Sequence, residues 1–193
     1  MEEKYAYIEG AEQPIAMHPK KFALWLFIVT VVMIFASLTS AYIVRQSEGN
    51  WLEFDLPEIF WYNSAIIILS SITLHWAFMS AKKDDLAKIR LGMILTSVLG
   101  VAFLVGQWYS WAALVERDVF FVGNPAGSFL YVFTGLHAFH LISGVIFLII
   151  VLISSFKYKV HSKNMDAMEM CVTYWHFLGG LWLYLFMFLL LNH

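Results

Sequence analysis

Five long apolar segments constrain the fold of this chain more than any other feature of its sequence. They cover residues 22–44, 59–80, 91–114, 128–156 and 170–191. A helix needs about 20 apolar residues to cross the hydrocarbon core of a bilayer, and each segment is long enough. Charged residues make up 13% of the chain, against about 25% in soluble domains. The sequence therefore predicts an all-α polytopic membrane protein, with residues 1–193 forming a single transmembrane domain of five helices.

The basic residues are distributed unevenly between the two ends of the predicted helices. Ten of the 12 lie in the N-terminal tail and in the second and fourth connections, whereas Arg45 and Arg117 lie at the opposite end. Lysine and arginine accumulate in the cytoplasmic loops of membrane proteins. We therefore expect the N-terminus in the cytoplasm and the C-terminus on the outer side, which is the periplasm in a bacterium.

No carboxylate lies in the middle of a predicted span. The 12 basic and 14 acidic residues all fall in tails, connections or helix ends. Ion-coupled transporters and proton pumps usually carry such groups inside the membrane, so a small transporter is disfavoured. The net charge of −2 gives no basic surface for nucleic acid, and the single cysteine, Cys171, excludes an internal disulfide.

Four histidines lie inside the predicted spans: His75, His137, His140 and His176. The first interpretation is that they are neutral imidazoles that hydrogen-bond between helices or to lipid head groups. A second is haem ligation, because His75 and His176 lie at similar depths on two helices. A third is a quinone or metal site, since three histidines can bind zinc.

Small and polar residues form faces on two of the predicted helices. On the second, Ser64, Ser71 and His75 fall within about 40° of one another when each residue turns the helix by about 100°. On the third, Gly92, Thr96 and Gly100 share a face. Small residues let neighbouring membrane helices approach closely, so we expect helix contacts on both faces.

Several strings in order resemble subunit III of the haem–copper respiratory terminal oxidases, the cytochrome c and quinol oxidases, in its short five-span bacterial form. The likeness covers nearly all of residues 20–193. The strings are residues 24–27 (LWLF), 40–42 (SAY), 69–77 (LSSITLHWA), 134–140 (TGLHAFH) and 174–177 (YWHF).

The resemblance implies a non-redox accessory subunit without a catalytic centre. Such a subunit is expected in the bacterial cytoplasmic (inner) membrane, beside catalytic subunit I and a copper-carrying or quinol-oxidase subunit II. The haems and copper belong to those partners, and the complex reduces oxygen to water and pumps protons. The resemblance also implies bound phospholipid in a cleft between two helix groups, the first and second helices on one side and the third to fifth on the other.

The resemblance further implies no catalytic, cofactor-binding or metal-binding residue in this chain. Residues expected to make contacts between helices or with lipid are His75, Trp76, His137, His140, Trp175 and His176. The alternative function is a small b-type membrane cytochrome that carries its own haem.

At three positions the chain departs from the family pattern by lacking an acidic residue. The family commonly has a glutamate where this chain has Val31, a glutamate where it has Ser110, and an aspartate where it has Gly179. We therefore expect packing and lipid retention without a carboxylate-linked proton function.

Overall fold

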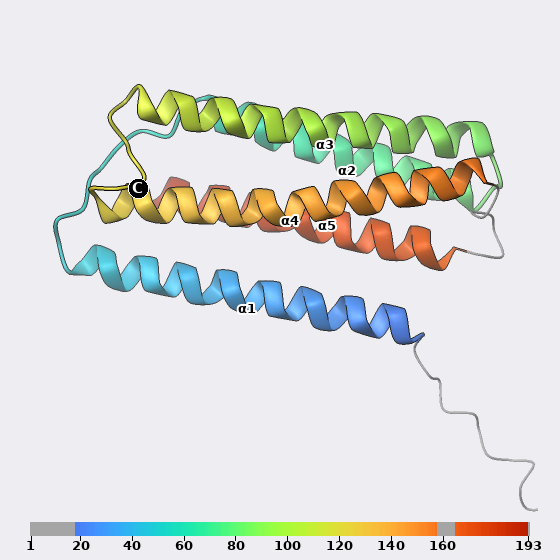
Figure 1. Ribbon diagram of the computed structural model, residues 1–193, viewed down its shortest axis with the longest axis horizontal. Coiled ribbons are helices and arrows are strands. Elements are labelled where there is room, and N and C mark those ends of the chain that lie inside the picture. The colour runs from blue at the N-terminus through green and yellow to red at the C-terminus, as the bar shows by residue number, and fades with distance from the viewer. Residues whose placement is uncertain (1–17, 158–164, 193) are drawn as a thin grey trace, which may run out of the picture.

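The computed structural model describes residues 18–157 and 165–192, and within these ranges the chain forms helices and no strands (Figure 1). The helices are α1 (Pro19–Ser47), α2 (Ile59–Ala81), α3 (Leu86–Val115), α4 (Pro125–Phe156) and α5 (Asp166–Asn192). All five are long and apolar enough to cross a membrane, which confirms the predicted five-span, all-helical fold. Three of the lysines used to predict the orientation, Lys4, Lys159 and Lys163, lie outside the described residues.

Polar caps extend the helices beyond the apolar segments. The Asp85 side chain caps α3 by accepting a hydrogen bond from the Lys88 backbone N–H over 3.3 Å. The Lys88 ammonium lies 2.6 Å from the same carboxylate, and this contact lowers the pKa of Asp85 below its ordinary value. Helix α3 therefore begins five residues before residue 91, where the apolar segment starts.

Helix α4 also begins before its apolar segment, which starts at residue 128. Asn124 caps the helix through the backbone N–H of Ala126, and Pro125 occupies the first helical position, where its missing N–H costs nothing. Gly127 is helical, and a Cβ there would lie 2.5 Å from the carbonyl oxygen of Phe120. This glycine thus serves a close approach of the preceding loop and does not break the helix.

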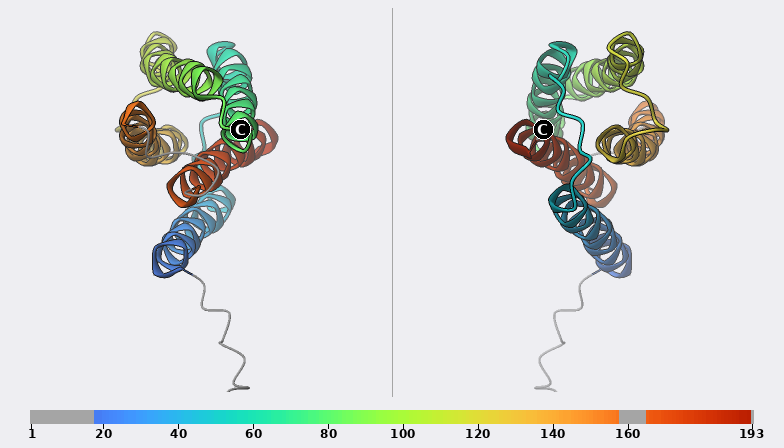
Figure 2. Two further views of the ribbon diagram at one scale, coloured as in Figure 1. Left: turned by 90° about the vertical axis from the view of Figure 1, so that its right-hand side faces the viewer. Right: turned by 90° about the vertical axis from the view of Figure 1, so that its left-hand side faces the viewer.

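Helices α2 to α5 form a ring around a common core. Each packs against its neighbours in the order α2–α3–α4–α5, and α5 closes the ring against α2. The end views of Figure 2 show this arrangement. Most of the buried residues of α2 follow helical spacing along one face that points into the ring, among them Ser64, Ile67, Ser70, Leu74, Ala77 and Ala81.

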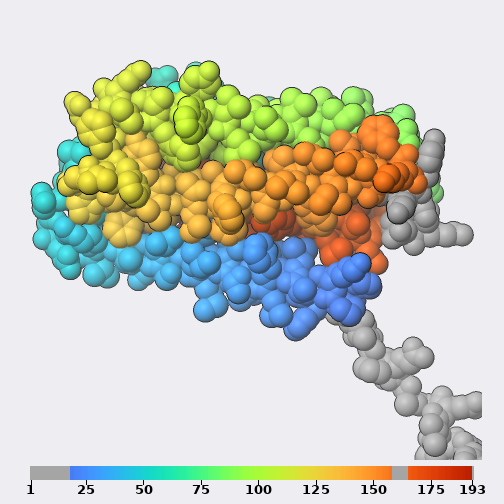
Figure 3. All heavy atoms as spheres, viewed as in Figure 1, coloured from blue at the N-terminus to red at the C-terminus, as the bar shows by residue number. Residues whose placement is uncertain are grey.

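Helix α1 lies outside the ring, along α4 and α5 (Figure 3). Within the described residues it makes no helix contact with α2, so the expected division into helices one and two against three to five is wrong. The physical reason is that the inner face of α2 already packs against α3 and α5. In the end views α5 lies between α1 and α2 (Figure 2).

The connection between α1 and α2 spans one end of the molecule. It is anchored to Asn124 at the start of α4, whose side chain accepts from the backbone N–H of Leu52 and donates to the carbonyl of Asn50. Arg117 also donates to the carbonyl of Asp55. These bonds hold the connection against the α3–α4 loop, and they account for α1 and α2 lying apart although they are consecutive.

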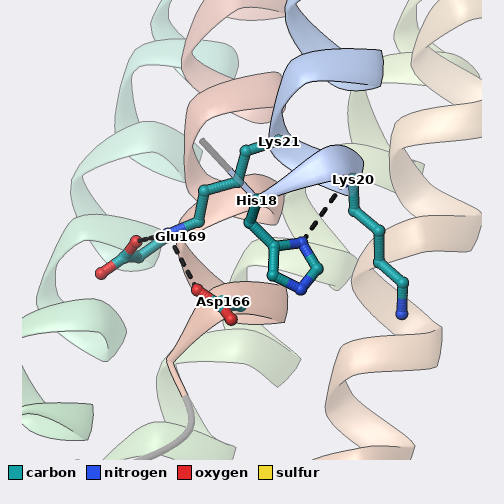
Figure 4. Close-up of polar contacts among 5 residues, drawn as sticks. All are labelled: His18, Lys20, Lys21, Asp166 and Glu169. Atoms are coloured by element: carbon teal, nitrogen blue, oxygen red, sulfur yellow. Dashed lines mark hydrogen bonds and ion pairs between the residues drawn. The ribbon is translucent and has the colours of Figure 1, made fainter. Parts of the chain in front are cut away.

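An ion cluster joins α1 to α5 at the other end (Figure 4). The Lys21 ammonium lies 2.8 Å from Asp166 Oδ1 and 2.7 Å from Glu169 Oε2. His18 caps α1 through the backbone N–H of Lys20. At the far end of α1, the Tyr42 hydroxyl donates to the carbonyl of Asn192 over 2.8 Å. Helix α1 is therefore fastened to α5 near both of its ends.

Candidate functional site

Trp175 of α5 occupies the centre of the four-helix ring. It is 1% exposed, and its indole N–H donates to Ser70 Oγ on α2 over 3.0 Å. A Cβ at Gly100 of α3 would lie 2.6 Å from Trp175 Cη2, and one at Gly144 of α4 would lie 3.4 Å from Trp175 Cε3. One side chain thus contacts all three other helices of the ring, and the glycine at position 100 makes room for it.

Trp182 repeats this arrangement two turns further along α5. Its indole N–H donates to Ser64 Oγ over 3.0 Å, and its ring meets Phe103 of α3 edge-on at 4.8 Å between centroids. The ring of His137 lies 5.3 Å from Trp182 and 5.9 Å from Phe103. His137 is fully buried, and neither of its ring nitrogens has a hydrogen-bond partner in the described part of the chain.

His140 lies on a different face of α4, although it follows His137 by one helical turn. Its Nδ1 is 2.8 Å from the carbonyl oxygen of Leu136 on the preceding turn. Its ring packs against Phe27 and Phe35 of α1, at 6.2 and 6.0 Å between centroids. His137 therefore belongs to the interior of the ring, and His140 belongs to the α1–α4 contact.

His75 and His176 meet on the outer surface, between α2 and α5. Their ring centroids are 6.1 Å apart and the ring planes are inclined by 50°. They line a groove of about 450 Å³ together with apolar residues, Ser71 and two glycines, Gly179 and Gly180. The structure thus brings together the two histidines that lie at matching depths in the sequence.

Trp76 lies beside this groove but turns toward α3. The residue is 39% exposed, and a Cβ at Gly92 would lie 3.2 Å from Trp76 Cε3 and 2.8 Å from Ala77 Cβ. One turn further along α3, the hydroxyls of Thr96 and Thr73 are 2.8 Å apart. Of the small-residue face expected on the third helix, Gly92 and Thr96 therefore pack against α2, whereas Gly100 faces Trp175 of α5.

Sequence reasoning missed Ser70 and Asn63. The stripe drawn through Ser64, Ser71 and His75 runs along the edge of the buried face, so Ser64 is buried but Ser71 opens onto the groove. Asn63 is buried and donates to Ser110 Oγ over 3.4 Å. The spacing of three and four residues along α2 carries the signal for Ser70, because Ser70 shares a face with Ile67 and Leu74.

The alternative metal site lacks ligands in this geometry. Within residues 18–157 and 165–192, no three histidine, cysteine or acidic side chains come together to hold an ion. Cys171 is free and buried. The zinc interpretation needed three clustered histidines, and the structure instead divides the four among the interior, the α1–α4 contact and the outer groove.

The three positions that lack the family's carboxylates lie in helix contacts. Val31 is 1% exposed and sits one turn from each of the two phenylalanines that pack on His140. The Ser110 hydroxyl donates to the carbonyl of Gly106. A Cβ at Gly179 would lie 3.2 Å from Ser71 Oγ. A valine, a serine and a glycine thus occupy three positions where an acidic side chain would be buried between helices.

Comparison with known proteins identifies the family of this chain. A family model described as cytochrome c oxidase subunit III matches residues 3–192. The cytochrome c oxidase subunit 3 of Corynebacterium diphtheriae is 30% identical over 169 residues, which cover 83% of this chain and 82% of that protein. The proteins of the same name from Thermostichus vulcanus and a Bacillus species are 28% and 25% identical, over 88% and 95% of this chain and 86% and 87% of their own lengths. The chain therefore belongs to the cytochrome c oxidase subunit III family.

Proposed function

We propose that this chain is the non-redox accessory subunit of a proton-pumping haem–copper terminal oxidase. In this role it packs beside catalytic subunit I, in a complex with a copper-carrying or quinol-oxidase subunit II, and it stabilises the catalytic subunit during oxygen reduction to water. The chain itself has no catalytic centre. It lies in the bacterial inner membrane with its N-terminus in the cytoplasm.

One observation carries this proposal beyond family membership. The middle of every span lacks a carboxylate, and two buried indoles of α5 donate hydrogen bonds across helix contacts, Trp175 to Ser70 and Trp182 to Ser64. A redox or proton-transferring subunit needs groups that hold a cofactor or exchange a proton inside the membrane. Side chains committed to joining helices are suited instead to a rigid body that supports a partner.

Purification of the complex from native membrane tests the proposal. The expected result is co-purification of this chain with oxidase subunits, identified by mass spectrometry, and no haem signal in the reduced-minus-oxidised spectrum of the separated chain. A haem band from the separated chain would establish the b-type cytochrome alternative, with His75 and His176 as the first ligand candidates.

Lipid retention is the second part of the proposed role. A hollow of about 210 Å³ lies between α1 and α5 at the end that carries the ion cluster. Its lining combines charged side chains, Lys21 and Glu169, with apolar ones, Leu24, Trp25 and Met170. Opposite charges beside an apolar wall match a zwitterionic phospholipid, whose head group carries both charges and whose chains are apolar.

A pair of variants tests this lipid site. Trp25→Ala removes part of the apolar wall, and we expect it to reduce the phospholipid retained per complex after detergent washing. Trp108→Ala is the matched control, because Trp108 is 69% exposed on α3 and does not line this hollow. Equal phospholipid content in both variants and the wild type would reject the site.

A further inference from the structure

A second hollow continues the His75–His176 groove on the other side of α5. It has a volume of about 410 Å³ and lies between α1 and α5, with Val32 and Ala36 in its wall. Gly180 lines both hollows. Because α1 and α2 stand on either side of α5 without touching, the two hollows form one trough. We call it the α5 trough: its floor is α5 around Gly180, and its walls are α1 and α2.

Two imidazoles face this trough, each more than one helical turn inside the end of its helix. Six residues separate His75 from the end of α2 at Ala81, which is about 9 Å along the helix axis. Ten residues separate His176 from the start of α5 at Asp166, which is about 15 Å. Neither imidazole hydrogen-bonds to a group within residues 18–157 or 165–192. Acyl chains carry no donor or acceptor, so an imidazole that faces them pays a desolvation cost without compensation.

The floor of the trough has an unused glycine. A Cβ at Gly180 would meet nothing within 4 Å, whereas a Cβ at Gly92, Gly100 or Gly144 would overlap a neighbouring helix. Close contacts between helices of this chain therefore explain why glycine occupies positions 92, 100 and 144. No such contact explains the glycine at position 180. A glycine on a membrane helix surface allows close approach of another helix.

We propose that a transmembrane helix of a partner polypeptide packs in the α5 trough, against Gly180, and presents a hydrogen-bonding side chain or carbonyl to His75 and His176. A protein helix supplies hydrogen-bonding groups to the two imidazoles, whereas lipid acyl chains supply none. The identification of the partner as another oxidase subunit rests on the proposed function; the docking itself rests on the trough.

Photo-crosslinking in native membranes tests this docking. The photoreactive residue p-benzoylphenylalanine is placed at Ile72, which lines the trough and is 59% exposed, or at Val98 of α3, which is 60% exposed outside it. We expect a protein crosslink from Ile72 at least tenfold stronger than from Val98. Lipid adducts alone at Ile72, in membranes where oxidase subunits co-purify, would overturn the docking and leave the proposed function intact. A crosslink to a polypeptide outside any oxidase would support the docking and reject the proposed function.

A double variant gives an independent measure. Replacing His75 and His176 by phenylalanine keeps the ring volume and removes the hydrogen-bonding nitrogens. We expect at least a tenfold loss of retained partner in detergent, with an unchanged helical circular dichroism spectrum. His137→Phe is the control, because His137 is enclosed by the ring and should leave the partner bound. Full retention of the partner in the double variant would refute the proposal.

Discussion

Gly100→Ala perturbs the centre of the ring at one atom. The new Cβ would lie 2.6 Å from Trp175 Cη2 and 3.2 Å from Val145 Cγ2. Trp175 has little room to withdraw, because its N–H is bonded to Ser70 and its other edge faces Gly144. The added methyl group must therefore push α3 away from α5 or break the Trp175–Ser70 hydrogen bond.

The expected cost follows from two opposing effects. Overpacking a core by one methylene costs about 1–3 kcal/mol. Replacing glycine by alanine inside a helix stabilises the helix by up to about 1 kcal/mol. We therefore expect Gly100→Ala to lower the free energy of unfolding by about 1–2 kcal/mol.

A double-mutant cycle separates this clash from other effects. Trp175→Phe removes the outer part of the indole ring, including Cη2, so Gly100→Ala should cost little in that background. The coupling between the two changes should reach about 1 kcal/mol, within the range for contacting residues. Unfolding of the purified chain in mixed detergent micelles, followed by circular dichroism, gives all four free energies.

The control for this cycle is Gly180→Ala. No atom lies within 4 Å of a Cβ at Gly180, so the isolated chain should keep or slightly gain stability. The reasoning is refuted if Gly100→Ala costs the same with Trp175 and with phenylalanine at position 175, or if Gly180→Ala is as destabilising as Gly100→Ala.

Three further predictions concern single side chains. His137→Phe should raise the free energy of unfolding by about 1–3 kcal/mol in the same micelle assay, because it removes a buried polar group without a partner in the described residues. A loss of stability would instead show that a bound water pairs with the imidazole. A carboxylate-reactive carbodiimide should leave residues 22–44 of the wild type unlabelled and should label Val31→Glu, which serves as the positive control; wild-type label there would contradict the absence of carboxylate chemistry. The pKa of Asp85 is lowered by Lys88, so its stabilisation of the α3 start is complete above the unfolded-state pKa and is lost as the pH falls through the lower folded-state pKa. The protection factor of the Lys88 amide, which is its exchange rate relative to the intrinsic rate at the same pH, should fall over that acid range in the wild type and should show no such step in Asp85→Asn.

The five spans and the packing face of α3 were predictable because both depend on local features of the chain. Length and apolar composition define a span, and the spacing of Gly92, Thr96 and Gly100 defines a face. The pairing of Trp175 with Ser70 was not predictable in the same way. Ser70 and Ser71 are adjacent, and packing against α3 and α5 decides which of them points inward.

The position of α1 could not be predicted either. Its surface is apolar on most sides, with large exposed residues such as Trp25, Met33 and Val44, so no stripe marks its partner. The division carried over from the family placed it with α2. The hydrogen bonds of Asn124 to the α1–α2 connection, between residues more than 70 positions apart, set the actual path.

The outlying place of α1 has a consequence for biosynthesis. This helix leaves the ribosome before α2 to α5, but its packing partners α4 and α5 are the last of the described helices to be made. Roughly 80 residues separate the end of α1 from the start of α4, which takes about 4–16 s to translate at typical speeds. During that interval α1 must remain in the bilayer without the two helices against which it packs. Because its surface is apolar on most sides, α1 is stable in contact with lipid during that interval. The ion cluster at Lys21 forms only after α5 has been synthesised and inserted.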